Sequence, residues 1–203
     1  MLKYQTLKPG DIIISTPYSS KGVVFNKAVI LIMSHDKTGT SGVIINKLLN
    51  KLDGSDILKS LQLSKAKSNS AKAKVSKSAS LNVYFGGPLE QEKGIILHSK
   101  DYDIAPSMKI TQNILISTNS HIINDIISGN GPIDKMLVLG YASWAEGQLI
   151  EEIKRNDWLL LIDNKPSNIF KLLFTEDPLY RWDYALSLTG INFNNYSHNI
   201  GNA

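Results

Sequence analysis

Three side chains combine a type that does acid-base or nucleophilic chemistry with a position beside a turn or a predicted helix: His98, Ser143 and Glu152. His98 ends the run Gly94-Ile-Ile-Leu-His98 and follows the turn Gly86-Gly87-Pro88, whose backbone amides could form a small anion-binding concavity. An imidazole there could act as a donor or a general base near neutral pH. The alternative is a strand-end histidine bonded to a loop carbonyl, and the sequence leaves both open.

Ser143 lies between an apolar run and a predicted helix, as the serine of a hydrolase nucleophile elbow does. That elbow needs Gly-x-Ser-x-Gly, whereas this chain has Gly140-x-x-Ser143-x-x-x-Gly147. Ser143-Trp-Ala-Glu146 instead matches a capping box, in which each side chain accepts a bond from the other residue's backbone amide. We therefore expect Ser143 to begin a helix, and Gly147 inside that helix predicts a close contact with its backbone.

Gln148 and Glu152 are four residues apart and would share one face of the predicted helix. This spacing suits either a ligand pocket or a structural polar network. Gly86-Gly87-Pro88 predicts a tight turn rather than a phosphate cradle, because no Gly-x-Gly-x-x-Gly or Gly-Lys-Ser/Thr pattern accompanies it. Trp144 predicts core packing rather than a base-stacking platform.

No metal or cofactor site is predicted. The four histidines are scattered, and no two are spaced to place ligands on one helix face. The chain has no cysteine, which excludes disulfides, thiolate zinc sites and cysteine nucleophiles and fits a reducing cytoplasm.

The net charge of +4 would suit a nucleic-acid or anionic partner, but one tract carries the excess. Residues 64–80 hold five lysines and no acid, and the remaining 17 basic residues nearly balance the 18 acidic ones. We expect a flexible Lys/Ser-rich loop at 64–80, with a nucleic-acid arm as the alternative. The longest apolar run, residues 28–33, is far short of the ~20 residues of a membrane helix, so we expect a cytoplasmic protein without a membrane partner.

The 203 residues suffice for one core and predict a single domain over 1–203. Short isoleucine- and valine-rich runs predict strands at 11–15, 28–33, 42–46, 81–85, 94–98, 110–117, 135–140 and 158–162. Helices are predicted at 53–63, 119–128 and 145–156 and from about 167 and 176, the last presenting Leu179, Trp182 and Leu186. Hairpins and helix-strand alternation occur together, which indicates a mixed α+β domain.

The segment Gly140-Tyr-Ala-Ser-Trp-Ala-Glu-Gly-Gln-Leu-Ile-Glu-Glu, together with Phe85-Gly86-Gly87-Pro88, resembles the signature of the YqgE/AlgH family of small bacterial proteins. Further matches at 42–46, 94–98, Trp158 and 182–191 extend the resemblance over nearly the whole chain. Leu48 stands where the family usually has proline. Ser143 stands where the family commonly has glycine, and this second departure argues against a shared serine mechanism.

The resemblance implies an α+β fold with a branched sheet curled into a partial barrel and helices packed outside. It also implies that Gln148 and Glu152 meet Asn46 and His98 across a polar groove. The full ligand-binding hypothesis comprises Asn46, Gly86, Gly87, Pro88, His98, Trp144, Gln148 and Glu152.

The leading functional interpretation is a non-enzymatic regulatory or interaction module that binds a partner protein or a small ligand. The family's usual label implies an alternative, a DNA-associated transcriptional regulator, although the sequence shows no helix-turn-helix with a basic recognition face. The third interpretation is a hydrolase-type enzyme that uses His98 with Glu152 or Ser143, and it requires these side chains to reach one substrate.

Overall fold

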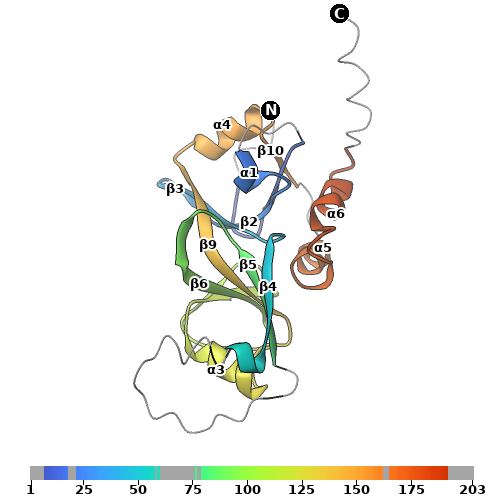
Figure 1. Ribbon diagram of the computed structural model, residues 1–203. Coiled ribbons are helices and arrows are strands. Elements are labelled where there is room, and N and C mark those ends of the chain that lie inside the picture. The colour runs from blue at the N-terminus through green and yellow to red at the C-terminus, as the bar shows by residue number, and fades with distance from the viewer. Residues whose placement is uncertain are drawn as a thin grey trace, which may run out of the picture.

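The strands form one branched, curled sheet in the computed structural model, which describes residues 7–17, 22–57, 59, 76, 79–161 and 165–191 (Figure 1). The strand order along the main path is β10-β1-β2-β3-β9-β6-β8-β7. Strand β5 branches from this path by pairing with β9, and β4 pairs with β5. The strands are β1 Ile12–Ser15, β2 Val29–Asp36, β3 Gly39–Ile44, β4 Leu48–Asp53, β5 Ser80–Phe85, β6 Leu89–Ser99, β7 Ser107–Lys109, β8 Ile114–Ser117, β9 Lys135–Ala145 and β10 Trp158–Leu160. The helices are α1 Gly22–Phe25, α3 His121–Ser128, α4 Gln148–Lys154, α5 Pro166–Phe170, the π-helical turn η2 Lys171–Thr175 and α6 Arg181–Leu188.

The branch lies on β9, which pairs with three strands. Its residues 137–139 pair with β5 in parallel and with β6 antiparallel, and its residues 142–145 pair with β3. Gly140 separates the two halves at φ 75°, and a Cβ there would lie 2.5 Å from the Gly87 carbonyl oxygen. The predicted α+β class, with a branched sheet curled into a partial barrel and helices outside, is confirmed.

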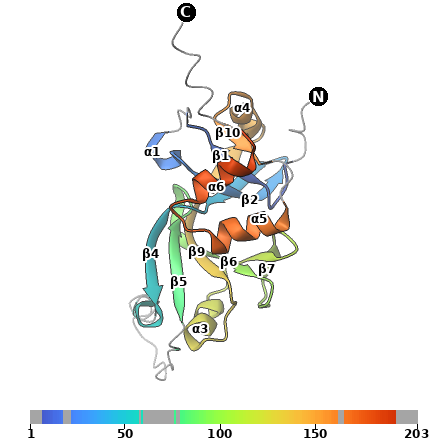
Figure 2. The same cartoon turned by 90° about the vertical axis from the view of Figure 1, so that its right-hand side faces the viewer.

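Both faces of the β1–β2–β3 region are buried, which explains its unbroken apolar runs. Ile12 and Ile14 point into a core that α5, η2 and α6 close, whereas Ile13 packs with Trp144 and Trp158 under α4. A third cluster packs Leu81 of β5 and Ile96 of β6 against the isoleucines of α3. Helix α3 lies at the end of the sheet away from α4 (Figures 1 and 2).

The helix predicted at 119–128 is observed as α3, which begins two residues later at His121 and ends at Ser128 as predicted. Asn119 Oδ1 accepts a bond of 3.0 Å from the amide of His121, and Gly129 ends α3 at φ 84°. Its stripe residues Ile122, Ile126 and Ile127 are buried.

Several predicted elements are wrong in extent. Of the strand predicted at 110–117, only residues 114–117 form a strand, β8, which pairs with β7. Residues 110–113 belong to the turn between them, where the amide of Ile110 bonds to the carbonyl oxygen of Ile114. Strand β4 was not predicted, since its residues alternate poorly and lie exposed. Helix α6 begins at Arg181 rather than near 176, so Leu179 is 82% exposed instead of packed.

Two predictions fall mainly on residues outside the described ranges. Of the predicted Lys/Ser loop at 64–80, only Ser76, Ala79 and Ser80 are described. Of the helix predicted at 53–63, residues 54–57 and 59 are helical, and Asp53 Oδ1 accepts bonds from the amides of Ser55 and Asp56. No helix in the described ranges combines the length and the apolar character that a membrane crossing requires.

Candidate functional site

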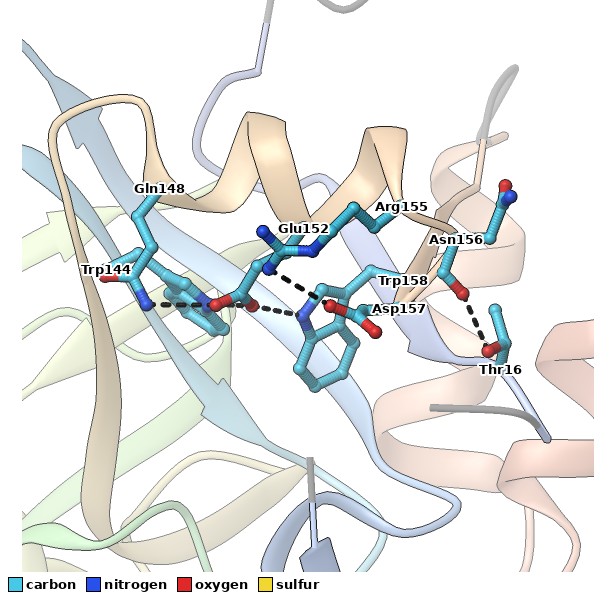
Figure 3. Close-up of polar contacts among 8 residues, drawn as sticks. All are labelled: Thr16, Trp144, Gln148, Glu152, Arg155, Asn156, Asp157 and Trp158. Carbon is cyan, nitrogen blue, oxygen red and sulfur yellow. Dashed lines mark hydrogen bonds and ion pairs between the residues drawn. The ribbon is translucent and has the colours of Figure 1, made fainter. Parts of the chain in front are cut away.

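A buried carboxylate joins β9, α4 and β10 (Figure 3). Glu152, 3% exposed, accepts bonds through Oε2 from the indole N–H of Trp144 at 3.0 Å and of Trp158 at 2.8 Å. Its Oε1 accepts a bond of 2.9 Å from Gln148 Nε2, and Gln148 Oε1 accepts one of 3.0 Å from the amide of Ala145. Three side-chain donors therefore compensate the buried charge, and the cluster fits the structural-network interpretation of Gln148 and Glu152.

The capping box predicted at Ser143 is wrong, because β9 continues through Ala145 and α4 begins only at Gln148. Ser143 is a strand residue opposite Ser41 of β3. Gly147 precedes the helix at φ 72°, and nothing lies within 4 Å of a Cβ built on it. This glycine is explained by its left-handed backbone and not by the close contact that was predicted.

His98 lies at the far end of the sheet from Glu152. It pairs with Lys135, nine residues before Trp144 on β9, which corresponds to roughly 25–30 Å along the strand. The imidazole is fully buried, its Nδ1 lies 2.9 Å from the Ser99 carbonyl oxygen, and its ring packs edge-on against Tyr102. Among the described residues its Nε2 has no hydrogen-bond partner. His98 and Glu152 cannot reach one substrate, so the structure argues against that enzymatic pairing.

Asn46 bonds to the backbone instead of facing the Glu152 cluster. Its Nδ2 donates to the Lys27 carbonyl oxygen at 2.7 Å, and its Oδ1 accepts from the Val29 amide at 2.9 Å. These bonds tie the segment after β3 to the start of β2. The structure thus brings together Trp144, Gln148 and Glu152 but adds neither Asn46 nor His98 to them.

The Gly86-Gly87-Pro88 turn packs its backbone against β9. A Cβ on Gly86 would lie 2.3 Å from the Gly140 carbonyl oxygen, and one on Gly87 would lie 2.2 Å from the carbonyl carbon of Tyr141. The amide of Gly86 donates to the Leu139 carbonyl oxygen at 2.8 Å. The glycines are required by this close approach, which is the tight-turn interpretation of the motif.

Beyond this turn β6 leaves β9 and opens a hollow, here called the β6 groove. Leu89 pairs with Tyr141 and Gly94 with Leu139, so four residues of β6 stand against Gly140 alone. The detour begins at Glu90 with φ 47°, an uncommon conformation for a residue other than glycine. The groove has a volume of about 550 Å³ and is lined by Met33, Ser41, Glu90, Lys93, Gly94, Ile95, Thr118 and Tyr141.

The groove combines an apolar floor with hydroxyl groups and one ion pair. Ser41 shares a hydrogen bond of 2.6 Å with Ser34, and its cross-strand partner Ser143 lies on the same sheet face. At the rim Lys93 Nζ lies 2.7 Å from Glu90 Oε2, and this contact raises the pKa of Lys93. The two rim charges cancel, so the groove as a whole carries no net charge.

Sequence reasoning missed the groove, although one signal was present. The polar run Glu90-Gln-Glu-Lys93 directly precedes the apolar run of β6 and interrupts the alternation of a paired strand. In the described part of the chain no group of three or more His, Asp or Glu residues could hold a metal ion.

Comparison with known proteins agrees with the architecture. The model of the AlgH-like family (DUF179) matches residues 12–194. The UPF0301 proteins RT0098 of Rickettsia typhi and RP032 of Rickettsia prowazekii are each 34% identical over 194 residues, which cover 96% of this chain and 95% of theirs. The solution structure of AlgH from Pseudomonas aeruginosa aligns over 100% of both chains with a TM-score of 0.69 at 24% identity. The crystal structure of DIP2367 from Corynebacterium diphtheriae aligns over 89% of this chain and 94% of that one, with a TM-score of 0.59 at 20% identity.

Proposed function

The chain belongs to the AlgH-like family (DUF179), and we propose that it is a non-enzymatic binding module that holds a small ligand in the β6 groove. The observation that carries the proposal is the groove itself. Its volume of about 550 Å³ lies within the range of roughly 300–1,000 Å³ typical of ligand sites. Its floor is apolar, and a few polar groups converge on it, which is the usual composition of such sites.

The lining favours a ligand with an apolar body and no net charge. Met33, Ile95 and the ring of Tyr141 would contact the apolar part, and the Ser41 hydroxyl could bond to an amide or hydroxyl group. Glu90 and Lys93 offer one charge of each sign at the rim. A neutral amide or a zwitterion fits this arrangement, whereas a polyanion such as nucleic acid meets no excess of positive charge.

The buried groups explain why binding is proposed rather than catalysis. Glu152 is surrounded by donors from Trp144, Trp158 and Gln148, and His98 is fully buried at the other end of β9. Neither lines the groove. An acid-base mechanism needs such groups within hydrogen-bond reach of the same substrate.

The test uses four probes that share a phenyl ring and differ in charge: L-phenylalanine, phenylacetamide, phenylacetate and phenethylammonium. Each is titrated into ¹⁵N-labelled protein while the amide resonances of Gly94, Thr118 and Tyr141 are followed. At about 0.3 kcal/mol per heavy atom, a probe of this size should bind in the millimolar range. We expect the zwitterion and the neutral amide to shift these resonances at lower concentration than the two singly charged probes.

A variant that fills the groove provides the control. Ser41→Trp should abolish the shifts, whereas Ser187→Trp on the exposed side of α6 should leave them unchanged. If no probe perturbs the groove amides at about 10 mM, or if Ser41→Trp binds as the parent does, the small-ligand proposal is wrong.

A further inference from the structure

Large apolar side chains are exposed in one region formed by α1, the start of β4 and the turn before α6. This region, here called the α1–β4–α6 surface, exposes 39–88% of each of its six apolar members. They are Val23, Val24, Leu48, Leu49, Leu179 and Tyr180. Exposed apolar residues scattered singly are ordinary, whereas a group of six is not.

Side-chain contacts hold the three parts of this surface together. Lys47 Nζ donates to the carbonyl oxygens of Val23 at 3.1 Å and Val24 at 2.5 Å, so α1 lies against the start of β4. Arg181 Nη1 donates to the Ile45 carbonyl oxygen, and its guanidinium lies 4.9 Å from the ring centroid of Tyr84.

Tyr84 is in turn the strand partner of Leu48, so the start of α6 lies beside the start of β4. The ammonium group of Lys27, just after α1, lies 4.9 Å from the Trp182 ring centroid of α6. Figure 2 shows α1, the beginning of β4 and α6 in this arrangement.

The size of the surface suits association with another protein copy. Six residues at these exposures present roughly 600 Å² of accessible area, most of it apolar, which is the upper end for a monomer and approaches the roughly 800 Å² that each partner buries in a standard interface. Among the described residues β4 pairs only with β5, so its outer edge is open beside these side chains. Both features make the surface costly to leave in water.

The surface is bordered by exposed charges of both signs. Exposed Lys51 and Asp53 lie on its β4 side, and exposed Lys27, Asp177 and Asp183 lie on its α6 side. A two-fold axis through the surface would let Lys51 of one copy pair with Asp183 of the other, and the same pair would form twice because the contact is isologous. We propose that a second copy of this chain covers the α1–β4–α6 surface in a two-fold dimer.

Sedimentation equilibrium of the full chain tests this proposal, which is independent of the groove. The wild-type protein should dimerise with a dissociation constant of roughly 1–100 µM. Val23→Asp and Leu179→Asp should each raise that constant at least about tenfold, because a carboxylate would be buried at the interface. Ile133→Asp is the matched control, since Ile133 is 76% exposed outside the surface, and it should change the constant less than about twofold.

Far-UV circular dichroism checks that each of the three variants remains folded. Because Val23 and Leu179 lie on different segments, local misfolding of one segment would not explain an effect of both variants. A second test restores charge pairing: Lys51→Glu should weaken the dimer, and adding Asp183→Lys to it should recover most of the loss. A wild-type protein that stays monomeric to about 500 µM overturns the proposal, as does an equal effect of Ile133→Asp and Leu179→Asp.

Discussion

Replacing Glu152 with glutamine should destabilise the protein by about 2 kcal/mol, although the two side chains have nearly the same size and shape. The amide oxygen can face the indoles of Trp144 and Trp158 and keep both bonds, now without the charge. The amide nitrogen then faces Gln148 Nε2, a donor against a donor. Gln148 cannot turn over without losing the bond from the Ala145 amide.

The magnitude follows from these contacts. Bonds to a charged group contribute about 1.5–3 kcal/mol and neutral ones about 0.5–1.5 kcal/mol, so weakening two bonds and losing one costs roughly 3 kcal/mol. A neutral amide is less costly to bury than a carboxylate, and this difference offsets part of the loss of stability. A net loss of about 2 kcal/mol remains.

Urea denaturation followed by tryptophan fluorescence and circular dichroism measures the effect. At a slope of about 2 kcal/mol per molar urea, the midpoint should fall by roughly 1 M. The control is Glu151→Gln on the same helix, whose carboxylate is 60% exposed and pairs only with Lys154 among the ion pairs of the described residues. It should leave the urea midpoint nearly unchanged, because solvent screens an exposed ion pair.

Trp144→Phe, which removes the indole donor and keeps an aromatic ring, completes a double-mutant cycle with Glu152→Gln. We expect a coupling energy of about 1 kcal/mol between the two positions. If Glu152→Gln is no more destabilising than Glu151→Gln, or if the coupling vanishes, the indole-carboxylate cluster does not stabilise the junction of β9, α4 and β10 as argued.

Two further predictions concern backbone packing and alkaline pH. Gly86→Ala should lower the free energy of unfolding by more than about 3 kcal/mol, because its Cβ would lie 2.3 Å from a backbone oxygen of Gly140. Gly147→Ala should lower it by only about 1 kcal/mol, because the new Cβ meets open space and only the positive φ is unfavourable. Similar shifts in thermal midpoint for the two variants would contradict this. Burial and the bond to Asp125 raise the pKa of Tyr102 to about 12, so its stabilising contribution is present below pH 10 and is lost as the pH rises toward 12. Absorbance titration should show an ionisation near pH 12 that Tyr102→Phe removes, and ionisation of Tyr102 near pH 10 would refute the assignment.

Strands with continuous apolar runs could be predicted from the sequence because burial on both faces leaves a strong local pattern. Residues 29–33 of the run at 28–33 form the buried start of β2, and the run at 135–140 lies in β9, where fully buried residues alternate with less buried ones. Helix α3 could be predicted as well, since its isoleucine residues, the side chain of Asn119 before its first turn and its terminal Gly129 are all local signals. The branch itself came from the family resemblance and not from these patterns.

The candidate site was less predictable because its geometry depends on long-range pairing. Ser143 and Glu146 match a capping box, yet pairing of β9 with β3 extends the strand to Ala145 and delays the helix. The β6 groove depends on a register shift between β6 and β9, and the polar run at 90–93 is its one local signal in the sequence. His98 and Glu152 were placed in one pocket because no sequence signal gave their separation along β9.

The three pairings of β9 have a consequence for how the chain folds during synthesis. Its partners β3, β5 and β6 all precede it, and its contacts with β3 join residues about a hundred positions apart. Until residue 145 has left the ribosome, the apolar β2–β3 hairpin has no strand to close its inner edge. Such late, non-local closure favours slow folding and prolonged exposure of aggregation-prone surface, so the nascent chain should depend on holding chaperones until β9 emerges.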